Sequence, residues 1–136
     1  MLLPPQDPPP LPYLEVDEQA GYDIDFEVLL NGEVVSRPPY ASMYWSPAQM
    51  LAHLTVNGAS LRTGDLFASG TISGEEREQR GSFLELSWGG AEPFTAGGRL
   101  RTFLEDGDEV TIRATAPGAL GGRLALGDVT GRISPS

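Results

Sequence analysis

The chain has 136 residues, which suits one domain with a single core, and its formal net charge is −10. Such a charge would repel nucleic acids and anionic membrane surfaces, and no run of Lys or Arg offsets it. The absence of cysteine excludes a disulfide framework, a thiolate zinc site and a cysteine nucleophile, while 17 glycines and 12 prolines favour turns and short strands.

Six of the twelve prolines lie within residues 1–12, so we expect a proline-rich connecting segment there, with the folded domain at 13–136. The segment is either a disordered tail or a crossing connection from a preceding domain. It lacks the basic start and long apolar core of a signal peptide. No apolar run reaches the roughly 20 residues of a membrane-spanning helix. We therefore expect a soluble, cytoplasmic chain.

Residues 22–28 alternate between apolar and acidic side chains, which predicts a strand with one buried and one solvated face. Asn31-Gly32 predicts a type I′ hairpin, with residues 33–35 as the returning strand. The acidic residues of the first strand could suggest a metal site. No His or Asp cluster follows at metal-ligand spacing, so a solvated strand face is the simpler interpretation.

One short helix is predicted at about 46–57. Ser46 is a candidate N-cap, Pro47 fits the first helical position, and Gln49 completes a capping box. Asn57-Gly58 is a typical left-handed helix end. These signals predict where the helix begins and ends.

The same helix has an apolar and a polar face. We expect Met50, Leu51 and Leu54 to form its buried face. The only histidine, His53, shares the polar face with Gln49. That placement favours a hydrogen-bonded or exposed side chain over a catalytic one.

Short strands and turns are predicted after the helix. Gly70-Thr71 is a corner where the missing Cβ lets another group approach. We expect a turn at 63–65, a charged loop at 75–80, and strands at 66–68, 83–88, 99–104, 109–116 and 124–133. Together these elements predict a mainly β fold, a mixed β-sandwich or roll with one short helix.

Glu85 is the candidate site residue that the apolar pattern indicates. In a strand over 83–88 it would alternate with Phe83 and Ser87 and face a partly dry cleft. Desolvation there disfavours a charged carboxylate unless a cation or hydrogen-bond donor stabilises it. The alternative is an exposed glutamate on a sheet face. The sequence contains no Ser-His-Asp set, phosphate loop or dinucleotide fingerprint.

Several motifs, in order along nearly the whole chain, resemble the C-terminal part of the fumarylacetoacetase family. They are Gln6-Asp7-Pro8, Met43-Tyr44-Trp45, Gly64-Asp65-Leu66, ASGTISG at 68–74, LELSW at 84–88 and DGDEV at 106–110. The resemblance implies hydrolysis of the carbon–carbon bond of fumarylacetoacetate to fumarate and acetoacetate, in tyrosine and phenylalanine breakdown. It also implies a homodimer and the fold of the family's C-terminal part.

The same resemblance implies roles for two residues. Thr71 would contact the substrate through its hydroxyl or backbone N–H, and Glu85 would orient a histidine that deprotonates the attacking water. A divalent metal, Mg²⁺ or Ca²⁺, would polarise the substrate. The base and the metal ligands of the family precede the Gln6-Asp7-Pro8 motif. We therefore expect the chain alone to be inactive and an N-terminal part of the enzyme to complete it.

Some positions depart from the family pattern. His53 matches a helix histidine of the family rather than its base, Leu54 replaces a common second histidine, and Glu75 replaces a common proline. Two other interpretations stay open. One is another hydrolase of the superfamily, such as an acylpyruvase, and the other is a non-catalytic β module. The long match over 68–88 favours fumarylacetoacetases, since distant members share mainly the Gly-Thr corner.

Overall fold

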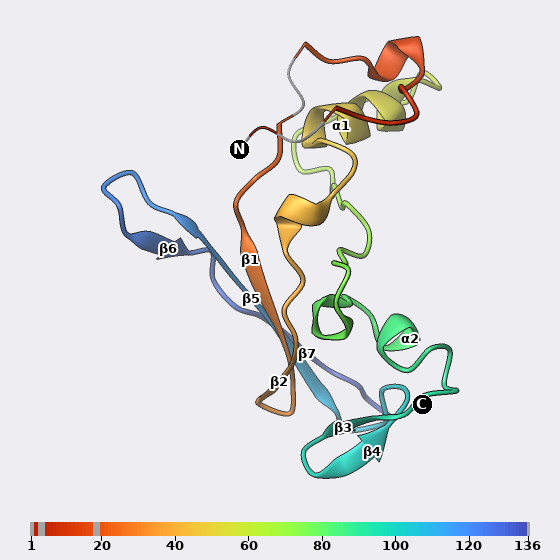
Figure 1. Ribbon diagram of the computed structural model, residues 1–136, viewed down its shortest axis with the longest axis vertical. Helices are drawn as coiled ribbons and strands as arrows, with labels where there is room; N and C mark the ends of the chain where they lie inside the picture. The colour runs from red at the N-terminus through yellow and green to blue at the C-terminus, as the bar shows by residue number, and fades with distance from the viewer. Residues whose placement is uncertain (1, 3–4, 18–19, 136) are drawn as a thin grey trace.

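The structure is a computed structural model that describes residues 2, 5–17 and 20–135. The described residues form a five-stranded sheet and a two-stranded sheet, and each strand pair is antiparallel. Helix α1 (Pro47–Thr55) lies at one end of the long axis, and the small sheet lies toward the other (Figure 1). The predicted mainly β class is confirmed.

The large sheet is built around its longest strand, β5. It pairs with β1 on one side and with both β6 and β7 on the other, and β2 extends the sheet beyond β1. The five strands are β1 (Asp25–Leu30), β2 (Glu33–Ser36), β5 (Glu109–Pro117), β6 (Arg123–Ala125) and β7 (Val129–Arg132). The predicted strand at 109–116 is confirmed, and the one predicted at 124–133 is divided into β6 and β7.

The hairpin between β1 and β2 has the predicted turn. Asn31 and Gly32 have φ values of 50° and 86°, and a type I′ turn requires positive φ at both central positions. The Asn31 side chain also accepts a hydrogen bond from the Glu109 N–H, at 2.9 Å, which ties the turn to β5. Strand β1 begins at Asp25 rather than at Tyr22.

Helix α1 begins as predicted. The Gln49 N–H donates to Ser46 Oγ (3.3 Å) and the Ser46 N–H donates to Gln49 Oε1 (3.0 Å), so the capping box is complete. At the other end, Gly58 adopts a φ of 85° and its N–H donates to the Thr55 carbonyl oxygen.

The predicted buried face of α1 is wrong. Leu51 and Leu54 are exposed and Met50 is half-buried, whereas the Gln49 side chain is only 1% exposed. The cause is the N-terminal segment, which packs over the polar face of the helix. Gln49 Nε2 donates to the Leu14 carbonyl and to Gln6 Oε1, both at 2.7 Å. A fully bonded amide thus takes the place of an apolar contact.

The region between α1 and β5 differs most from expectation. Residues 66–68 form no strand and pair with no neighbouring backbone; the Leu66 side chain is 95% exposed. The elements here are η3 (Arg77–Gln79), α2 (Phe83–Leu86), β3 (Phe94–Ala96) and β4 (Arg99–Arg101), with η1 (Pro12–Leu14) and η2 (Tyr40–Ser42) before α1. The strand predicted at 99–104 is thus shortened to β4, and the predicted charged loop contains the short 3₁₀ helix η3.

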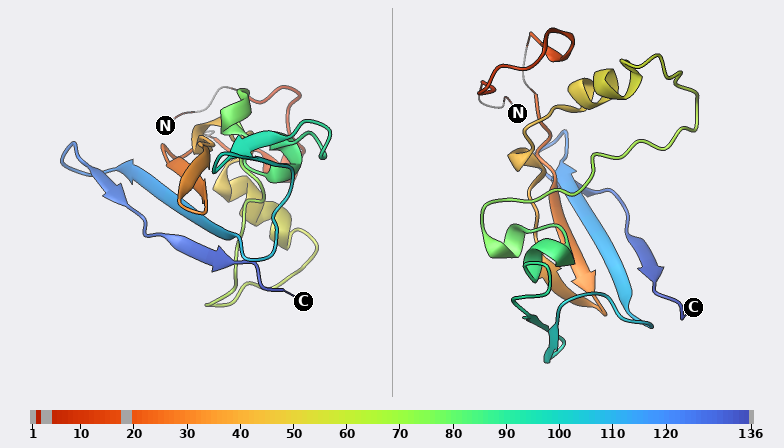
Figure 2. Two further views of the ribbon diagram at one scale, coloured as in Figure 1. Left: turned by 90° about the horizontal axis from the view of Figure 1, so that it is seen from below. Right: turned by 90° about the vertical axis from the view of Figure 1, so that its right-hand side faces the viewer.

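The chain around η3 is attached to the end of β2. The Arg37 N–H donates to the Glu78 carbonyl (2.7 Å), and Ser36 Oγ donates to the Arg80 carbonyl (2.5 Å). Figure 2 shows how the long loop after α1 returns beside the large sheet before it reaches α2. These bonds hold the start of the α2 region against the free edge of β2.

The buried apolar core is small. Its members among the described residues are Leu14, Leu29, Leu30, Tyr40, Leu86 and Ala96. Many large apolar side chains remain exposed, including Leu100 on β4 and Val129 on β7. Burial of apolar area is the main favourable contribution to folding, so this chain gains less of it than a self-contained domain of its length would.

Candidate functional site

The predicted strand at 83–88 is a short helix. Ser82 is its N-cap, with Oγ accepting the Glu85 N–H (3.3 Å), and the Leu86 N–H donates to the Ser82 carbonyl (3.0 Å). Leu84 and Trp88 are 62% and 67% exposed, whereas Leu86 is buried. These three side chains therefore do not form one buried face, as they would on a strand. Glu85 therefore lies in the first turn of a helix, and not on a strand whose face lines a cleft.

The Glu85 carboxylate is half-buried and bound through one oxygen. Oε2 accepts hydrogen bonds from Ser73 Oγ (2.7 Å) and Ser82 Oγ (3.0 Å). The Arg80 guanidinium donates to the Glu85 backbone carbonyl (3.0 Å) and not to the carboxylate. Across residues 2, 5–17 and 20–135, Oε1 accepts no hydrogen bond. One oxygen is thus anchored by neutral donors and the other is open to a further donor.

Thr71 lies on an exposed corner beside the chain that leads into α2. Gly70 adopts the left-handed conformation, with φ at 79°. A Cβ added at Gly81 would meet the Ile72 carbonyl oxygen at 2.0 Å and Thr71 Cγ2 at 3.1 Å. The two segments approach so closely that only glycine fits at position 81. Segment 71–73 therefore reaches the α2 region at two points, Thr71 at Gly81 and Ser73 at Glu85.

His53 belongs to a different part of the molecule. Its Nδ1 is 2.9 Å from the Tyr13 hydroxyl, the two rings stack at a centroid distance of 6.2 Å, and the side chain is exposed. The predicted hydrogen-bonded, exposed histidine is confirmed. In Figure 1 and in the right-hand view of Figure 2, α1 lies at the upper end of the molecule and α2 lies well below it, next to the small sheet. His53 is consequently not the partner of Glu85 in this chain.

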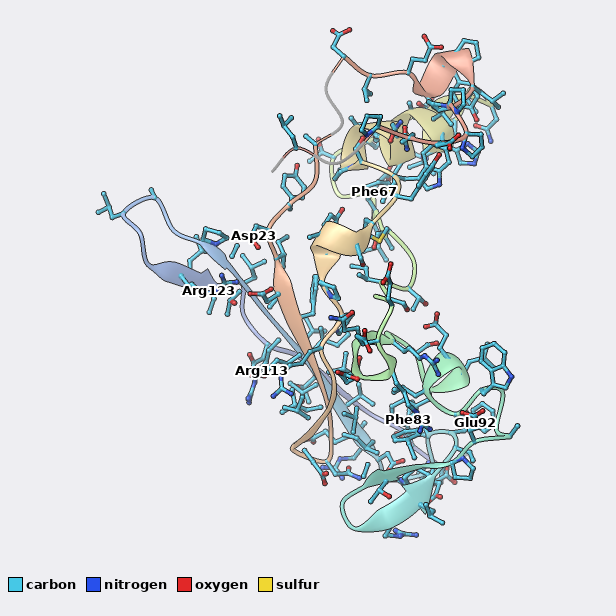
Figure 3. The ribbon with its side chains drawn as sticks, viewed as in Figure 1. Asp23, Phe67, Phe83, Glu92, Arg113 and Arg123 are labelled. Atoms are coloured by element: carbon cyan, nitrogen blue, oxygen red, sulfur yellow. The ribbon has the colours of Figure 1, made fainter. Side chains whose placement is uncertain are left out.

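A large cavity was not foreseen from the sequence. It measures about 850 Å³ and lies between the proline-rich segment, α1 and residues 66–69, with mostly apolar walls that include Trp45, Met50 and Phe67. Figure 3 labels Phe67 near α1, and Phe83 and Glu92 near α2 at the other end. Neither Thr71 nor Glu85 lines the cavity. The sequence signal for this cavity is the apolar pair Leu66 and Phe67, which line it and belong to no strand.

Residues 5–125 match the family model described as fumarylacetoacetate (FAA) hydrolase, C-terminal. The chain belongs to the fumarylacetoacetate hydrolase family. Fumarylacetoacetases from Homo sapiens, Arabidopsis thaliana and Caenorhabditis elegans are 48%, 46% and 41% identical to it over 98% of this chain and 33% of each relative. The chain thus spans about a third of the length of the relatives it matches, and the resemblance seen in its motifs is confirmed.

No carboxylate or histidine cluster suited to a metal occurs among the described residues. A group of three or more His, Cys, Asp or Glu side chains that could hold an ion is absent from this part of the chain. Two of the three acidic side chains before and within β1 form ion pairs instead, Asp25 with Arg123 (2.5 Å) and Glu27 with Arg37 (3.1 Å). The described side chains therefore offer no metal site by themselves.

The remaining titratable cluster lies between β4 and β5. Arg101 and Asp108 are both buried and form an ion pair, and Asp108 also accepts hydrogen bonds from the Asn31 amide (2.9 Å) and the Glu105 N–H (2.8 Å). Burial raises the pKa of Asp108, but these donors and the Arg101 charge together outweigh it and hold the pKa below its ordinary value. The cluster joins the β1–β2 turn to β4.

Within the described ranges, none of the helices is long and apolar enough to cross a membrane. The longest of them, α1, is a nine-residue element with a complete capping box.

Proposed function

We propose that this chain is the C-terminal part of a fumarylacetoacetase, which hydrolyses the carbon–carbon bond of fumarylacetoacetate to yield fumarate and acetoacetate. The observation that carries the proposal is the 41–48% identity to three fumarylacetoacetases over 98% of this chain. The activity belongs to a complete enzyme, because the chain spans only about a third of those relatives. The pathway it would serve is tyrosine and phenylalanine breakdown.

The geometry of Glu85 supports the role of a residue that orients a histidine. Serine hydroxyls hold Oε2, and Oε1 has no donor in the part of the chain that the structure describes. An imidazole N–H donating to Oε1 would be held in one orientation and tautomer, and its other nitrogen would take a proton from water. As that nitrogen gains the proton, the carboxylate stabilises the imidazolium. Glu85 itself keeps its charge throughout.

Thr71 would contact the substrate. It is exposed on a corner that lies against Gly81, and its hydroxyl makes no hydrogen bond to a described residue. A hydroxyl or backbone N–H at this corner can donate to a substrate oxygen without first losing a protein partner. Ser73, two residues further on, binds Glu85. The loop that carries Thr71 would therefore contact both the substrate and, through Ser73, the histidine-orienting carboxylate.

Groups outside this chain would complete the site. They are the histidine that Glu85 orients and, if the enzyme uses Mg²⁺ or Ca²⁺, the ligands of that ion, since the described residues offer no cluster for one. We propose that the preceding part of the same enzyme supplies them and that the complete enzyme is a homodimer. The many exposed apolar side chains are consistent with both contacts. A cytoplasmic location stays a prediction.

The proposal is tested with a hybrid enzyme, in which this chain replaces the matching third of the Homo sapiens relative. Fumarylacetoacetate hydrolysis is measured for the hybrid and for the chain alone, with Mg²⁺ and Ca²⁺ present. We expect turnover from the hybrid only. Glu85→Gln keeps the shape but removes the charge that supports the imidazolium, so it should lower kcat by about 10²- to 10⁴-fold.

The matched control is Glu75→Gln, the same chemical change at an exposed loop position that forms no ion pair with a described residue. It should leave kcat unchanged. A folded hybrid without activity, or a Glu85→Gln hybrid with normal turnover, would contradict the proposal. Hydrolysis by the chain alone would mean that the base lies within it, and His53 would then be the first residue to replace.

A further inference from the structure

Two serine hydroxyls from different segments converge on one carboxylate oxygen. Ser73 lies in the loop after Thr71, and Ser82 is the N-cap of α2. Both hydroxyls donate to Glu85 Oε2, at 2.7 Å and 3.0 Å. Hydrogen bonds to a charged acceptor are about twice as strong as neutral ones, so the pair restrains the carboxylate more than a single contact would.

Each serine also accepts a backbone N–H. Gly81 donates to Ser73 Oγ (3.0 Å), and Glu85 donates to Ser82 Oγ (3.3 Å). A hydroxyl has one proton to donate and two lone pairs to accept with. Because the amide protons occupy acceptor positions, each hydroxyl proton is left for the carboxylate. The hydrogen-bond directions are therefore set by the backbone on both sides.

Ser73 is itself held in place from two sides. Ser42 Oγ, at the end of η2, donates to the Ser73 carbonyl (2.8 Å). On the other side, Gly81 lies so close that no side chain fits there. These contacts hold the main chain of Ser73, and rotation of its hydroxyl away from Glu85 would break both the bond to Oε2 and the bond from the Gly81 N–H. Ser82 is held by its position at the start of α2, where its carbonyl accepts the Leu86 N–H (3.0 Å).

We propose that Ser73 and Ser82 are positioning residues for the reaction, which fasten Oε2 so that Oε1 points at the group that Glu85 orients. The inference rests on the proposed function, in which that group is a histidine from another part of the enzyme. Loss of either hydroxyl lets the carboxylate rotate about its terminal bond. Oε1 then meets the imidazole in the correct orientation for only part of the time.

The test uses steady-state kinetics of the hybrid enzyme. Ser73→Ala and Ser82→Ala should each lower kcat roughly tenfold, because small misplacements of a catalytic group are costly, while KM changes by less than about twofold. Ser73→Thr keeps the hydroxyl and should restore most of kcat. Ser69→Ala is the control: its hydroxyl donates only to the carbonyl of the next residue, Gly70 (3.0 Å).

A double substitution separates positioning from general destabilisation. In the Glu85→Gln background, Ser73→Ala and Ser82→Ala should lower kcat no further, because the charge they position is gone. If the kcat losses of the serine and Glu85 substitutions multiplied, the serines would act independently of the Glu85 charge, and the inference would be overturned. The proposed function fails separately, when Glu85→Gln itself leaves turnover unchanged. The inference alone fails when Glu85→Gln is damaging and both serine variants are fully active.

A second measurement needs no turnover. The carboxyl carbon resonance of Glu85, assigned by its absence in Glu85→Gln, is recorded by NMR for the hybrid enzyme. It should move in Ser73→Ala and in Ser82→Ala and stay in place in Ser69→Ala. A resonance that does not respond to either serine would contradict the paired contact, whatever the activity of the hybrid.

Discussion

Glu85 carries its charge between two serine hydroxyls and forms no ion pair with a described residue. A carboxylate held only by neutral donors keeps its full attraction for an incoming cation, such as an imidazolium. A neighbouring arginine would compete with it. Arg80 is close, but its guanidinium binds the backbone carbonyl of Glu85. The residue is thus restrained without being neutralised.

Thr71 gives a prediction about binding. Thr71→Ala removes one neutral hydroxyl, and such a hydrogen bond contributes about 1 kcal/mol. In the hybrid enzyme we expect KM to rise roughly fivefold, with a smaller change in kcat. Steady-state kinetics over a range of fumarylacetoacetate concentrations measures both. An unchanged KM would show that the substrate does not use this hydroxyl, and Thr71→Ser is the control that retains it.

Asp108 gives a prediction about pH. The pKa of this carboxyl is held below its ordinary value of 3.8, so the folded chain binds the proton less readily than the unfolded chain. The stabilisation is complete above pH 3.8 and disappears as the pH falls through the lower pKa of the folded state. Denaturant unfolding followed across that acidic range should show the loss.

Asp108→Asn is the matched variant for that titration. It cannot ionise, and it leaves the buried Arg101 guanidinium without its closest carboxylate. We expect it to be less stable at neutral pH and to lack the acidic transition assigned to Asp108. An identical pH dependence in the variant and the parent chain would assign the transition to another carboxyl group.

At the residue scale, the role of Glu85 stays a prediction. The alternation of Phe83, Glu85 and Ser87 predicted a strand, which is wrong because residues 83–86 are helical. The histidine-orienting role of Glu85 depends on the resemblance to the family. Its hydrogen-bond partners were not predictable from spacing. Ser73 lies twelve residues before it, and only the folded loop brings the two together.

Helix α1 shows what local signals can predict. Ser46, Pro47 and Gln49 correctly predicted its start, because a capping box depends on groups within a few residues. The burial of its faces depends on what packs against them, and the N-terminal segment covers Gln49 instead of the leucines. Local hydrogen bonding was visible in the sequence, whereas the tertiary contact was not.

Helix α2 shows a conflict between two local signals. Leu84 and Leu86 fit the alternation of a strand, while Ser82 and Glu85 have the spacing of a helix start. The structure follows the second signal, since the Glu85 N–H is bonded to Ser82 Oγ. Four residues are too few for hydrophobic periodicity to decide between helix and strand. The N-cap was the better guide in this segment.

The cap of α1 gives a prediction at this scale. Ser46→Ala removes the acceptor for the Gln49 N–H in a buried position, and loss of an N-cap costs about 1–2 kcal/mol. Chemical unfolding of the chain measures the free energy directly. Ser46→Asp, which retains an acceptor, should recover most of the loss. Ser46→Ala with undiminished stability would mean that the helix does not depend on its capping box.

The whole molecule has a small core and a large exposed apolar surface. Exposed side chains include Leu66, Leu84, Trp88, Leu100 and Val129, drawn from both ends of the molecule and from both sheets. Soluble monomers rarely expose so many large apolar groups without a partner. The mainly β class was predictable from the turn and strand pattern. Pairing of β6 and β7 with the same strand was not, because register depends on long-range contacts.

We therefore expect the isolated chain to self-associate. Size-exclusion chromatography with light scattering should give a mass above 14.5 kDa that falls on dilution, and a dye for apolar surface should bind strongly. In the hybrid enzyme, dye binding per chain should be lower because the preceding part covers some of this surface. A compact, cooperative monomer that binds no dye would contradict the expectation and favour a self-contained β module.

The bonds from Ser36 and Arg37 to residues 78–80 give the loop before α2 a second role. This loop leads to Glu85, and it also binds the end of β2. An opening motion that pulled it away would break these bonds and uncover the end of β2, to which another chain could add. Movement of the segment that leads to Glu85 and exposure of this strand end would then be linked.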